Sequence, residues 1–315
     1  MNTQTRDHGG GLDAAARQFG GARADWIDLS TGINPVAYPV GAIESDAWTA
    51  LPDQAAQSAL TDAARQFWDV PQQAAILATQ GASAPIAMIP RLRETGRVHI
   101  AAPTYNEHAA AFAAAGWTAA ATRQDADAQV VVHPNNPDGR LFTATDLSAP
   151  LRIVDESFCD VTPAASLIPQ AATKGTLILK SFGKFWGLAG LRLGFAIGDP
   201  DLVAGLAQML GPWPVAGPAL RIGATALRDP DWASETRKRL TTDSARLDTL
   251  LQGAGATTVG GTTLFRLYEV DDAARWQTHF AHHHIWSRVF PYNARWLRLG
   301  LPAPHQWPCL EAALQ

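Results

Sequence analysis

Short apolar runs alternate along the chain with longer segments in which apolar residues recur every three or four positions. The runs have the length and composition of buried strands, at Arg97–Ala101, Gln129–His133, Leu151–Val154, Leu177–Lys180 and Leu193–Ile197. The longer segments predict helices, at Ala55–Phe67, Ser83–Leu92 and Asn106–Ala115. Apolar strands separated by helices predict an α/β fold, with a largely parallel sheet covered by helices on both faces.

The pattern changes around Gly211-Pro212-Trp213-Pro214. Two helical stretches follow, and after them come an amphipathic segment at Thr262–Glu269, a helix near 271–284, and strands at Ile285–Phe290 and Trp296–Leu301. This order predicts a smaller α+β domain. We therefore expect an N-terminal arm at residues 1–35, a large domain at 36–212 and a small domain at 213–315.

The run Lys180–Gly194 carries the most informative chemistry of the sequence. Ser181 stands three residues before Lys184, and Arg192 stands eight residues after it, with a glycine two positions to either side. A primary amine can form a Schiff base with an aldehyde, and a hydroxyl and a guanidinium can hold a phosphate. Because pyridoxal 5′-phosphate carries both groups, the run predicts that cofactor. A lone lysine after a buried strand would indicate only a solvated turn.

Two further strand ends offer polar groups suited to the ring of this cofactor. Asp155 follows the apolar run Leu151–Val154, so its carboxylate would be buried and would need a partner. Facing a pyridine nitrogen, it would keep that nitrogen protonated and let the ring accept electrons. The Asn136 amide, in the turn-forming segment His133–Gly139, suits the ring oxygen. Taken alone, Asp155 would indicate a helix cap or an ion pair, and Asn136 an ordinary loop.

Two helix starts add to the predicted site. Gly81-Ala82-Ser83 opens a predicted helix, whose first backbone N–H groups form an anion site. Pro103-Thr104-Tyr105 follows a predicted strand and offers an aromatic face to a planar ring. Each signal is weak by itself. However, they occur in order on successive strand ends, which is where open α/β sheets bind ligands.

Composition narrows the class of protein further. The chain has 315 residues, of which 47% are hydrophobic and 17% charged, an ordinary balance for a globular enzyme. A net charge of −4 gives no electrostatic reason to expect nucleic acid or an anionic membrane as a partner. Two cysteines are too few for a disulfide framework, and the first ten residues lack the apolar core of a signal peptide. We expect a soluble, cytoplasmic protein.

These motifs together resemble the fold type I, aspartate-aminotransferase-like enzymes that depend on pyridoxal phosphate. The matching residues span most of the chain: Gly81-Ala82-Ser83, Pro103-Thr104-Tyr105, Asn135-Asn136-Pro137-Asp138-Gly139, Asp155-Glu156, and Ser181 and Lys184 with Gly190, Arg192 and Gly194. The resemblance implies the type I transferase fold, with a mainly parallel seven-stranded sheet in an α/β large domain and a smaller α+β C-terminal domain. It also implies a homodimer.

Within that superfamily, the chain looks most like the threonine-phosphate decarboxylase branch of cobalamin biosynthesis. Three features carry this resemblance: His8-Gly9-Gly10 followed by the segment 28–35, Asp155-Glu156-Ser157-Phe158, and Pro212-Trp213-Pro214-Val215. In the second, Phe158 stands where histidinol-phosphate aminotransferases usually carry a tyrosine that binds the ring oxygen.

The resemblance implies a role for each matched position around the cofactor. Lys184 would bind the aldehyde, Asp155 the pyridine nitrogen and Asn136 the ring oxygen. Tyr105 would stack on the ring. The phosphate would be held by the residues at three motifs, namely Gly81, Ala82 and Ser83, Ser181, and Arg192.

On the substrate side, the resemblance implies that the N-terminal arm contributes to binding a small phosphorylated amino acid. The matching positions are His8, Gly9, Gly32, Asn136, Arg288 and Arg298. There are two departures from the family pattern. Gly32 stands where an asparagine contacts substrate in enterobacterial-type sequences. Leu51 stands where many relatives have a tyrosine that reaches the cofactor phosphate of the neighbouring subunit.

The activity implied is decarboxylation of L-threonine O-3-phosphate to (R)-1-amino-2-propanol O-2-phosphate and carbon dioxide. The same residues could remove a proton instead, so an aminotransferase of the histidinol-phosphate type is the first alternative. A non-catalytic binding or regulatory protein with this fold is the second, and the intact set of Lys184, Asp155 and Arg192 argues against it. His279 and His283 have a metal-ligand spacing, but no third ligand completes a set, so we predict no native metal.

Overall fold

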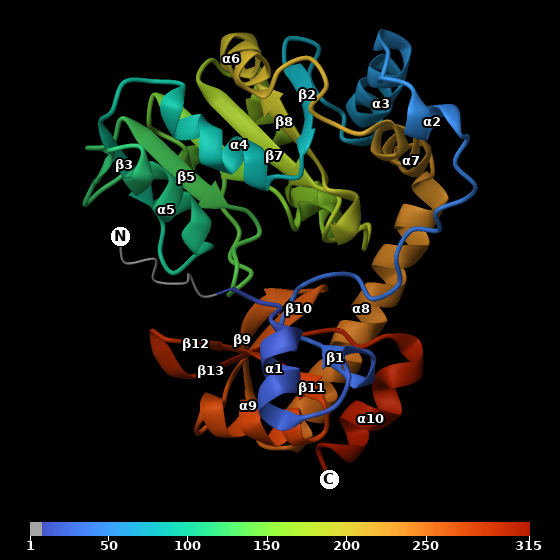
Figure 1. Ribbon diagram of the computed structural model, residues 1–315. Coiled ribbons are helices and arrows are strands. Elements are labelled where there is room, and N and C mark those ends of the chain that lie inside the picture. The colour runs from blue at the N-terminus through green and yellow to red at the C-terminus, as the bar shows by residue number, and fades with distance from the viewer. Residues whose placement is uncertain (1–7) are drawn as a thin grey trace. The chain divides into compact units, whose positions relative to one another are not determined.

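The computed structural model describes residues 8–315, which form two compact units (Figure 1). The larger unit holds residues 37–136 and 140–235. The smaller unit holds the described residues before 37, the short stretch Pro137–Gly139 and residues 236–315. Residues 213–235, where the sequence analysis began the small domain, lie with the larger unit because helix α7 (Gly217–Leu227) packs against helix α3 (Gln54–Phe67).

A seven-stranded sheet forms the centre of the larger unit. In spatial order its strands are β2 (Ala75–Gln80), β8 (Leu193–Gly198), β7 (Thr176–Ser181), β6 (Leu151–Asp155), β5 (Ala128–Val132), β3 (Arg97–Ile100) and β4 (Thr118–Ala119). Strand β8 is antiparallel to both of its neighbours, and the pairs from β7 through to β4 are parallel. The predicted α/β fold with a mainly parallel sheet is confirmed.

Burial explains which strands the sequence revealed. Every residue of β5 and β8 is buried, and so are the first five residues of β7, so these strands read as continuous apolar runs. The sequence analysis did not predict β2 or β4, which are the two edges of the sheet and are largely half-buried or exposed.

Helices pack on this sheet through a shared apolar core. Ile86 of helix α4 (Ser83–Met88), Phe112 of helix α5 (Asn106–Ala114) and Leu206 of helix α6 (Pro200–Leu210) belong to the same buried cluster as residues of β3, β5, β6, β7 and β8. The remaining helix within this unit is α2 (Asp46–Thr49). Helix α8 (Pro230–Gly253) begins in the larger unit and continues into the smaller one.

The smaller unit contains two sheets. The four-stranded one is antiparallel, in the order β12 (Arg288–Phe290), β13 (Asn293–Gly300), β10 (Phe265–Glu269) and β9 (Thr257–Thr262). The two-stranded one pairs β1 (Ile27–Asp28) with β11 (Ile285–Trp286) in parallel. Its helices are α1 (Leu12–Phe19), α9 (Ala273–His282) and α10 (Trp307–Ala312).

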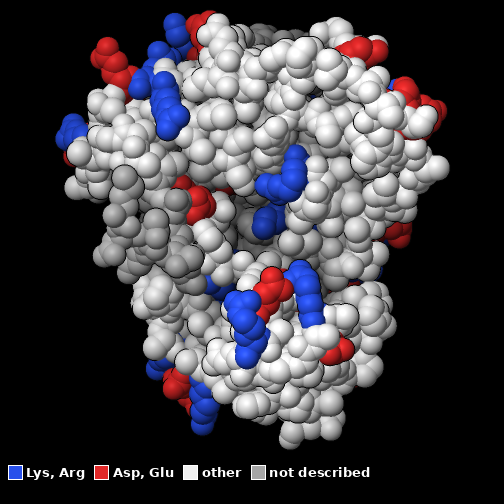
Figure 2. All heavy atoms as spheres, in the orientation of Figure 1, with Lys and Arg blue, Asp and Glu red and all other residues white. Residues whose placement is uncertain are grey.

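One predicted strand is divided in the structure. The segment Ile285–Phe290 was expected to be continuous, but the chain changes sheet at buried Ser287, so that β11 pairs with β1 and β12 pairs with β13. Within residues 8–315, none of the helices combines the length and the apolarity that crossing a bilayer requires. On the face drawn in Figure 2, acidic and basic side chains are scattered among uncharged ones.

Candidate active site

Predicted site residues of the larger unit lie where the parallel strands of its sheet have their carboxyl ends, and we call this side of the sheet its carboxyl edge. Asp155 ends β6, Ser181 ends β7, and Gly81 comes directly after β2. Arg192 precedes the antiparallel strand β8, so it lies at the same edge. The register supports this placement, because Gly194 of β8 pairs with Ser181 on one side and with Thr79 of β2 on the other. This edge is where parallel sheets bind their ligands.

Asp155 is a buried carboxylate with defined partners. One oxygen lies 2.9 Å from Nε2 of His108, and the other accepts hydrogen bonds from the backbone N–H of Ser157, at 3.0 Å, and from its hydroxyl. Burial alone would raise the pKa of Asp155, but the hydrogen bond and charge of His108 and the donors of Ser157 lower it overall. The side chain is therefore kept anionic, as a partner for a protonated ring nitrogen must be.

His108 is a residue that the sequence analysis missed. It lies in the first turn of α5, is 1% exposed, and its ring meets the ring of Tyr105 edge-on with a centroid distance of 6.1 Å. Helix α5 thus brings Tyr105 and Asp155 together through His108. A histidine in an otherwise alanine-rich helix was the only sequence signal available.

Lys184 lies in a tightly packed loop between β7 and β8. Its Nζ lies 5.1 Å from the centre of the Phe158 ring, three residues after Asp155. The loop is closed by hydrogen bonds from the N–H of Gly187 to the carbonyl of Lys184 and from the N–H of Leu188 to the carbonyl of Phe182, both 3.1 Å long. The structure therefore brings the amine close to the segment that carries Asp155.

Close backbone packing shapes the predicted phosphate site. A Cβ on Gly81, which has a φ of +67°, would lie 2.7 Å from a guanidinium nitrogen of Arg192. A Cβ on Gly194 would lie 2.5 Å from the carbonyl carbon of Gly81 and 2.6 Å from the N of Ala82. Arg192 is exposed, and Ser83 begins helix α4. Because Gly81 and Gly194 have no Cβ, the Arg192 guanidinium can lie beside the backbone turn at Gly81, an arrangement that fits a phosphate.

The two remaining predicted contacts lie on loops that are joined to each other. Asn135 accepts a hydrogen bond from the hydroxyl of Thr104, at 2.6 Å, and donates one to the carbonyl of Pro103, at 3.0 Å. These bonds tie the loop that carries half-buried Asn136 to the loop that leads into Tyr105. The hydroxyl of Ser181 accepts from the N–H of Gly183, at 3.2 Å. Together these features of the larger unit fit pyridoxal phosphate.

All of the predicted substrate residues except Asn136 lie in the smaller unit, and four of them form a second cluster there. Arg288 on β12 pairs directly with Arg298 on β13. Arg288 donates to the carbonyl of His8, at 2.8 Å, and Arg298 donates to the carbonyl of Ser30, at 2.7 Å. A Cβ on Gly9 would lie 2.4 Å from the same carbonyl oxygen of Ser30. The structure therefore brings these four predicted residues together around Ser30, which the sequence analysis did not identify.

The electrostatics of this cluster favour an anion. Arg298 is 5% exposed, and its burial, followed by the charge of Arg288, lowers the pKa of its guanidinium to about 10. A buried cation next to another cation is relieved by a negative ligand. Gly32 is buried in the loop after β1, in the same unit, and Arg295 is exposed and forms an ion pair with Glu269 at 2.8 Å.

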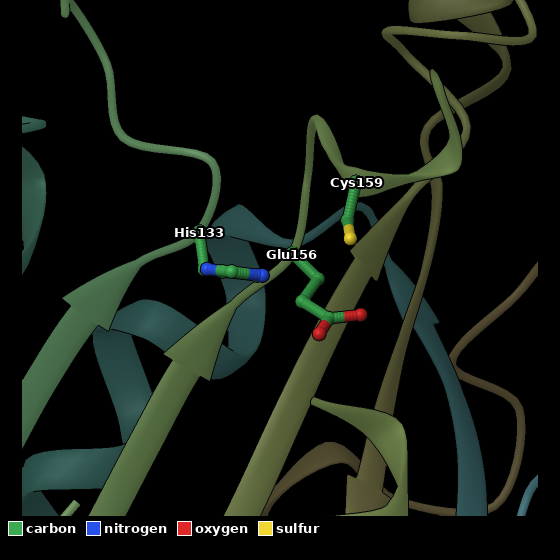
Figure 3. Close-up of side chains that lie close together, drawn as sticks. All are labelled: His133, Glu156 and Cys159. Carbon is green, nitrogen blue, oxygen red and sulfur yellow. The ribbon is translucent and has the colours of Figure 1, made fainter. Parts of the chain in front are cut away.

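Another group near the strand ends has the composition of a metal site. Ligand atoms of His133, Glu156 and Cys159 lie within 4.8 Å of one another (Figure 3). The ring of His133 is already engaged, because Nδ1 accepts from the N–H of Phe142 and Nε2 lies 2.7 Å from the carbonyl of Ala165. Burial and the charge of Glu156 raise the pKa of the Cys159 thiol, which therefore stays protonated. Because both ring nitrogens of His133 already have protein partners, we interpret the group as packing.

Two histidines near the C-terminal end of α9, His279 within the helix and His283 directly after it, also have protein contacts. The rings of His279 and His283 are 5.2 Å apart between centroids, and Nε2 of His279 lies 2.7 Å from the carbonyl of Ala313.

Comparisons with known proteins agree with the fold. A family model described as aminotransferase class I and II matches residues 24–314. The chain is 39% identical to a threonine-phosphate decarboxylase of Pseudomonas aeruginosa over 98% of this chain and 97% of that protein. It is 40% identical to one of a Sinorhizobium species, over 93% of this chain and 92% of the relative.

Solved structures show the same fold at lower identity. The histidinol-phosphate aminotransferase of Sinorhizobium meliloti, solved in complex with pyridoxal 5′-phosphate, matches with a TM-score of 0.84 and 19% identity. The match covers 99% of this chain and 95% of that one. With the family model and both decarboxylases matching over nearly the whole chain, the protein belongs to the aminotransferase class I and II family.

Proposed function

We propose that the protein is a pyridoxal-phosphate-dependent decarboxylase of L-threonine O-3-phosphate, which forms (R)-1-amino-2-propanol O-2-phosphate and carbon dioxide. The observation that carries this proposal is the pairing of Arg288 with buried Arg298, because two cations side by side suit a small substrate that bears two anionic groups. The near-complete matches to two threonine-phosphate decarboxylases support it.

The cofactor, when bound, supplies an electron sink for the charge left on the substrate carbon after carbon dioxide departs. Asp155, held anionic by His108 and Ser157, keeps a proton on the ring nitrogen. Lys184 would hold the aldehyde of the cofactor, and its Nζ would supply the proton to the substrate Cα.

The other residues of the larger unit bind and orient. The turn at Gly81, Ala82 and Ser83, together with Ser181 and Arg192, binds the cofactor phosphate. With the cofactor bound, Tyr105 would stack on the ring and Asn136 would donate to its ring oxygen. These contacts would fix the position of the ring, and positioning of this kind contributes much of the rate.

Substrate orientation depends on the smaller unit. Arg288 and Arg298 bind the carboxylate and the phosphate of the substrate, with His8 and Gly9 completing the anion site beside Ser30. Gly32 lines the site without a side-chain contact. The bond that breaks joins Cα to the carboxylate carbon. Its electron pair would be shared between Cα and the bound cofactor until a proton from Nζ of Lys184 forms the new C–H bond at Cα.

The test is to measure carbon dioxide release from threonine phosphate with no oxo-acid acceptor present. Decarboxylation needs no acceptor, whereas an aminotransferase of the histidinol-phosphate type transfers the amino group and needs one to turn over. Stoichiometric release with retention of the amino group in the product supports the proposal. Turnover that depends entirely on an added oxo acid, with no carbon dioxide formed, would establish the aminotransferase alternative.

We also propose that the protein works as a homodimer in the cytoplasm, as a step of cobalamin biosynthesis. The larger unit exposes a set of apolar side chains, Trp48 at 67%, Leu51 at 68% and Trp213 at 52%. Trp213 also lines a hollow of about 600 Å³ beside edge strand β2. Exposed apolar surface next to a concavity is typical of protein interfaces.

Sedimentation of wild type and of Trp48→Ser/Trp213→Ser tests the dimer. We expect the double variant to dissociate at a higher protein concentration than wild type, while Leu141→Ser, at a residue 52% exposed, serves as the matched control. A fully active wild-type monomer at low concentration would contradict the proposal.

The cysteines support the proposed cytoplasmic location. Cys159 and Cys309 are both free thiols, which is typical of a reducing compartment.

A further inference from the structure

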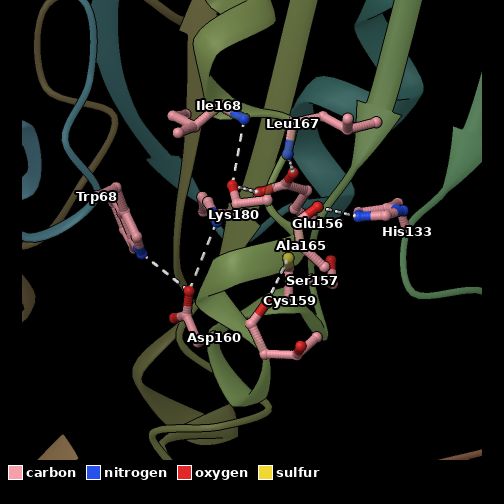
Figure 4. Close-up of polar contacts among 12 residues, drawn as sticks. Trp68, His133, Glu156, Ser157, Cys159, Asp160, Ala165, Leu167, Ile168 and Lys180 are labelled. Carbon is pink, nitrogen blue, oxygen red and sulfur yellow. Dashed lines mark hydrogen bonds and ion pairs between the residues drawn. The ribbon is translucent and has the colours of Figure 1, made fainter. Parts of the chain in front are cut away.

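The larger unit contains a buried charge cluster made by Lys180, Glu156 and Asp160 (Figure 4). Lys180, whose side chain is 2% exposed, forms an ion pair of 2.6 Å with Glu156 and lies 3.6 Å from a carboxylate oxygen of Asp160. We call these three residues the Lys180 cluster. None of them belongs to the site as proposed above. Burying three charges costs free energy that only close ion pairs and hydrogen bonds offset, so their contacts need to be accounted for.

Every charge in the Lys180 cluster has partners. Glu156 also accepts from the hydroxyl of Ser166, at 2.7 Å, and from the N–H of Leu167, at 2.5 Å. Asp160 accepts from the indole N–H groups of Trp68, at 2.8 Å, and Trp186, at 3.1 Å. Although burial opposes its charge, Glu156 and Asp160 together raise the pKa of Lys180 above its ordinary value. The Lys180 amine is therefore protonated at neutral pH.

The Lys180 cluster is also connected through the backbone to Asp155 and Ser181, the proposed cofactor contacts at the ends of β6 and β7. Glu156 follows Asp155, and its N–H bonds the carbonyl of Leu179, which extends the pairing of β6 with β7. Lys180 precedes Ser181 on β7, and successive strand residues point to opposite faces. The cluster thus lies on the reverse side of the strands that end in Asp155 and Ser181.

The link to Lys184 passes through Trp186. This indole is fully buried and stacks between Phe182, at 5.1 Å, and Trp232, at 5.3 Å, each with an interplanar angle of 11°. Its N–H is bound to Asp160. The loop that carries Lys184 is consequently anchored, two residues beyond the amine, to the same cluster that fixes the end of β6.

We propose that Lys180 is a positioning residue, which through Glu156 and Asp160 sets the placement of the Lys184 amine relative to the Asp155 carboxylate. The inference rests on the proposed roles of Lys184 and Asp155. Placement errors of about 1 Å can cost about a hundredfold in rate, so a distant charge that fixes two strand ends and a loop affects the chemistry without touching the ligand.

The test compares Lys180→Met with Lys180→Arg and with Lys174→Met, an exposed lysine that serves as the matched control. Each protein is loaded with pyridoxal phosphate and held well below its unfolding temperature, with the folded fraction checked by circular dichroism. Three quantities are measured: the pH midpoint of the visible absorbance, kcat and KM for threonine phosphate, and the unfolding temperature.

For Lys180→Met we expect the absorbance midpoint to move by at least about half a pH unit. We also expect kcat per folded molecule to fall by about tenfold to a hundredfold, with a smaller change in KM. Lys180→Arg should recover most of both, and Lys174→Met should match wild type. A purely structural role would lower only the unfolding temperature.

Trp186→Phe keeps the inference testable if Lys180→Met does not fold. It removes the hydrogen bond to Asp160 while retaining an aromatic ring in the stack, and we expect the same shifts with smaller size. An unchanged absorbance midpoint and unchanged kcat in the folded variants would overturn the proposal.

Measurements on wild type distinguish a failure of the proposed function from a failure of the proposed role of Lys180. Absence of any visible band with pyridoxal phosphate would defeat the proposed function itself. A band without carbon dioxide release would defeat only the assigned reaction, and the absorbance comparison would still decide the role of Lys180.

Discussion

The two units treat buried charge in opposite ways. In the larger unit, Lys180 is neutralised by Glu156 and Asp160, and Asp155 has His108 as its partner. In the smaller unit, buried Arg298 donates to the carbonyl of Ser30, and the nearby charge of Arg288 opposes its own. The first arrangement is complete within the protein, whereas the second gains from an added anion.

This difference separates two tasks. Charges that are matched internally hold strand ends and loops in place, and their loss leaves a buried partner uncompensated. Charges that repel one another are held together only because the fold positions them, and they favour a ligand that neutralises both. Variants in the larger unit should therefore alter the absorbance or binding of the cofactor. Variants in the smaller unit should alter only the kinetics with the substrate.

The largest expected effect is that of Lys184→Ala. Without the amine, the protein should lose both its visible absorbance and its turnover, although pyridoxal phosphate can still bind through the residues at Gly81, Ser181 and Arg192. Absorbance spectra and carbon dioxide release measure the two losses. A variant with the wild-type spectrum and full activity would show that another lysine does this work.

The smaller unit should respond differently. Arg298→Ala and Arg288→Ala each remove one partner of a desolvated contact with the substrate, which should cost about 2–5 kcal/mol in kcat/KM while the absorbance stays unchanged. Arg295→Ala is the matched control on the same strand as Arg298, because its side chain is exposed and paired with Glu269. Near-normal kinetics in both single variants would mean that the substrate is wrong or that its site lies elsewhere.

A backbone change should have a more moderate effect. Gly81→Ala places a Cβ 2.7 Å from the Arg192 guanidinium at a φ of +67°, and strain of this kind costs about 1–3 kcal/mol. We expect weaker retention of pyridoxal phosphate, measured as its dissociation constant by fluorescence titration. Gly190→Ala is the control, since its Cβ would meet no atom within 4 Å. Equal dissociation constants for both variants would disconnect this turn from the phosphate.

The smallest effect concerns acid stability. Because the pKa of Asp155 is lower in the folded protein than its ordinary value, its ionised form stabilises the fold above the unfolded pKa, and this stability is lost as the pH falls through the lowered value. The difference in unfolding free energy between wild type and Asp155→Asn should therefore narrow below about pH 4, by at most about 1.4 kcal/mol per pH unit. Denaturant titrations at several pH values measure it. A gap that widens with acid would reverse the sign assigned to this carboxylate.

Much of the fold was predictable because strands that are buried on both faces consist of continuous apolar residues, and such runs are visible in the sequence. The central strands β5, β7 and β8 are apolar along most or all of their length, and their predicted bounds agree with the structure within a few residues. The strands that escaped prediction, β1, β2, β4 and β9, all lie at edges of their sheets. Half-exposed edges carry mixed residues such as Thr257 and Gly260, so their pattern resembles that of a loop.

The candidate site divides in the same way. Lys184, Asp155 and Arg192 could be proposed because their chemistry and their position close to strand ends appear in the sequence itself. His108, Ser30 and the Lys180 cluster could not, because their importance depends on which way a helix face turns and which strand lies next to which. Those are properties of tertiary packing, and a single buried histidine or lysine does not reveal its partner.

The stack of Phe182, Trp186 and Trp232 gives the protein a built-in optical signal. Indoles held in a fixed stack, with centres 5.3 Å apart, lie in an asymmetric environment and contribute to the near-ultraviolet circular dichroism of the folded protein. The Trp186 ring belongs to the loop that carries Lys184 and Trp232 belongs to helix α8, so this signal reports whether that loop is packed on the helix. An experimenter can follow this packing in real time without attaching a dye, and can do so before any cofactor is added.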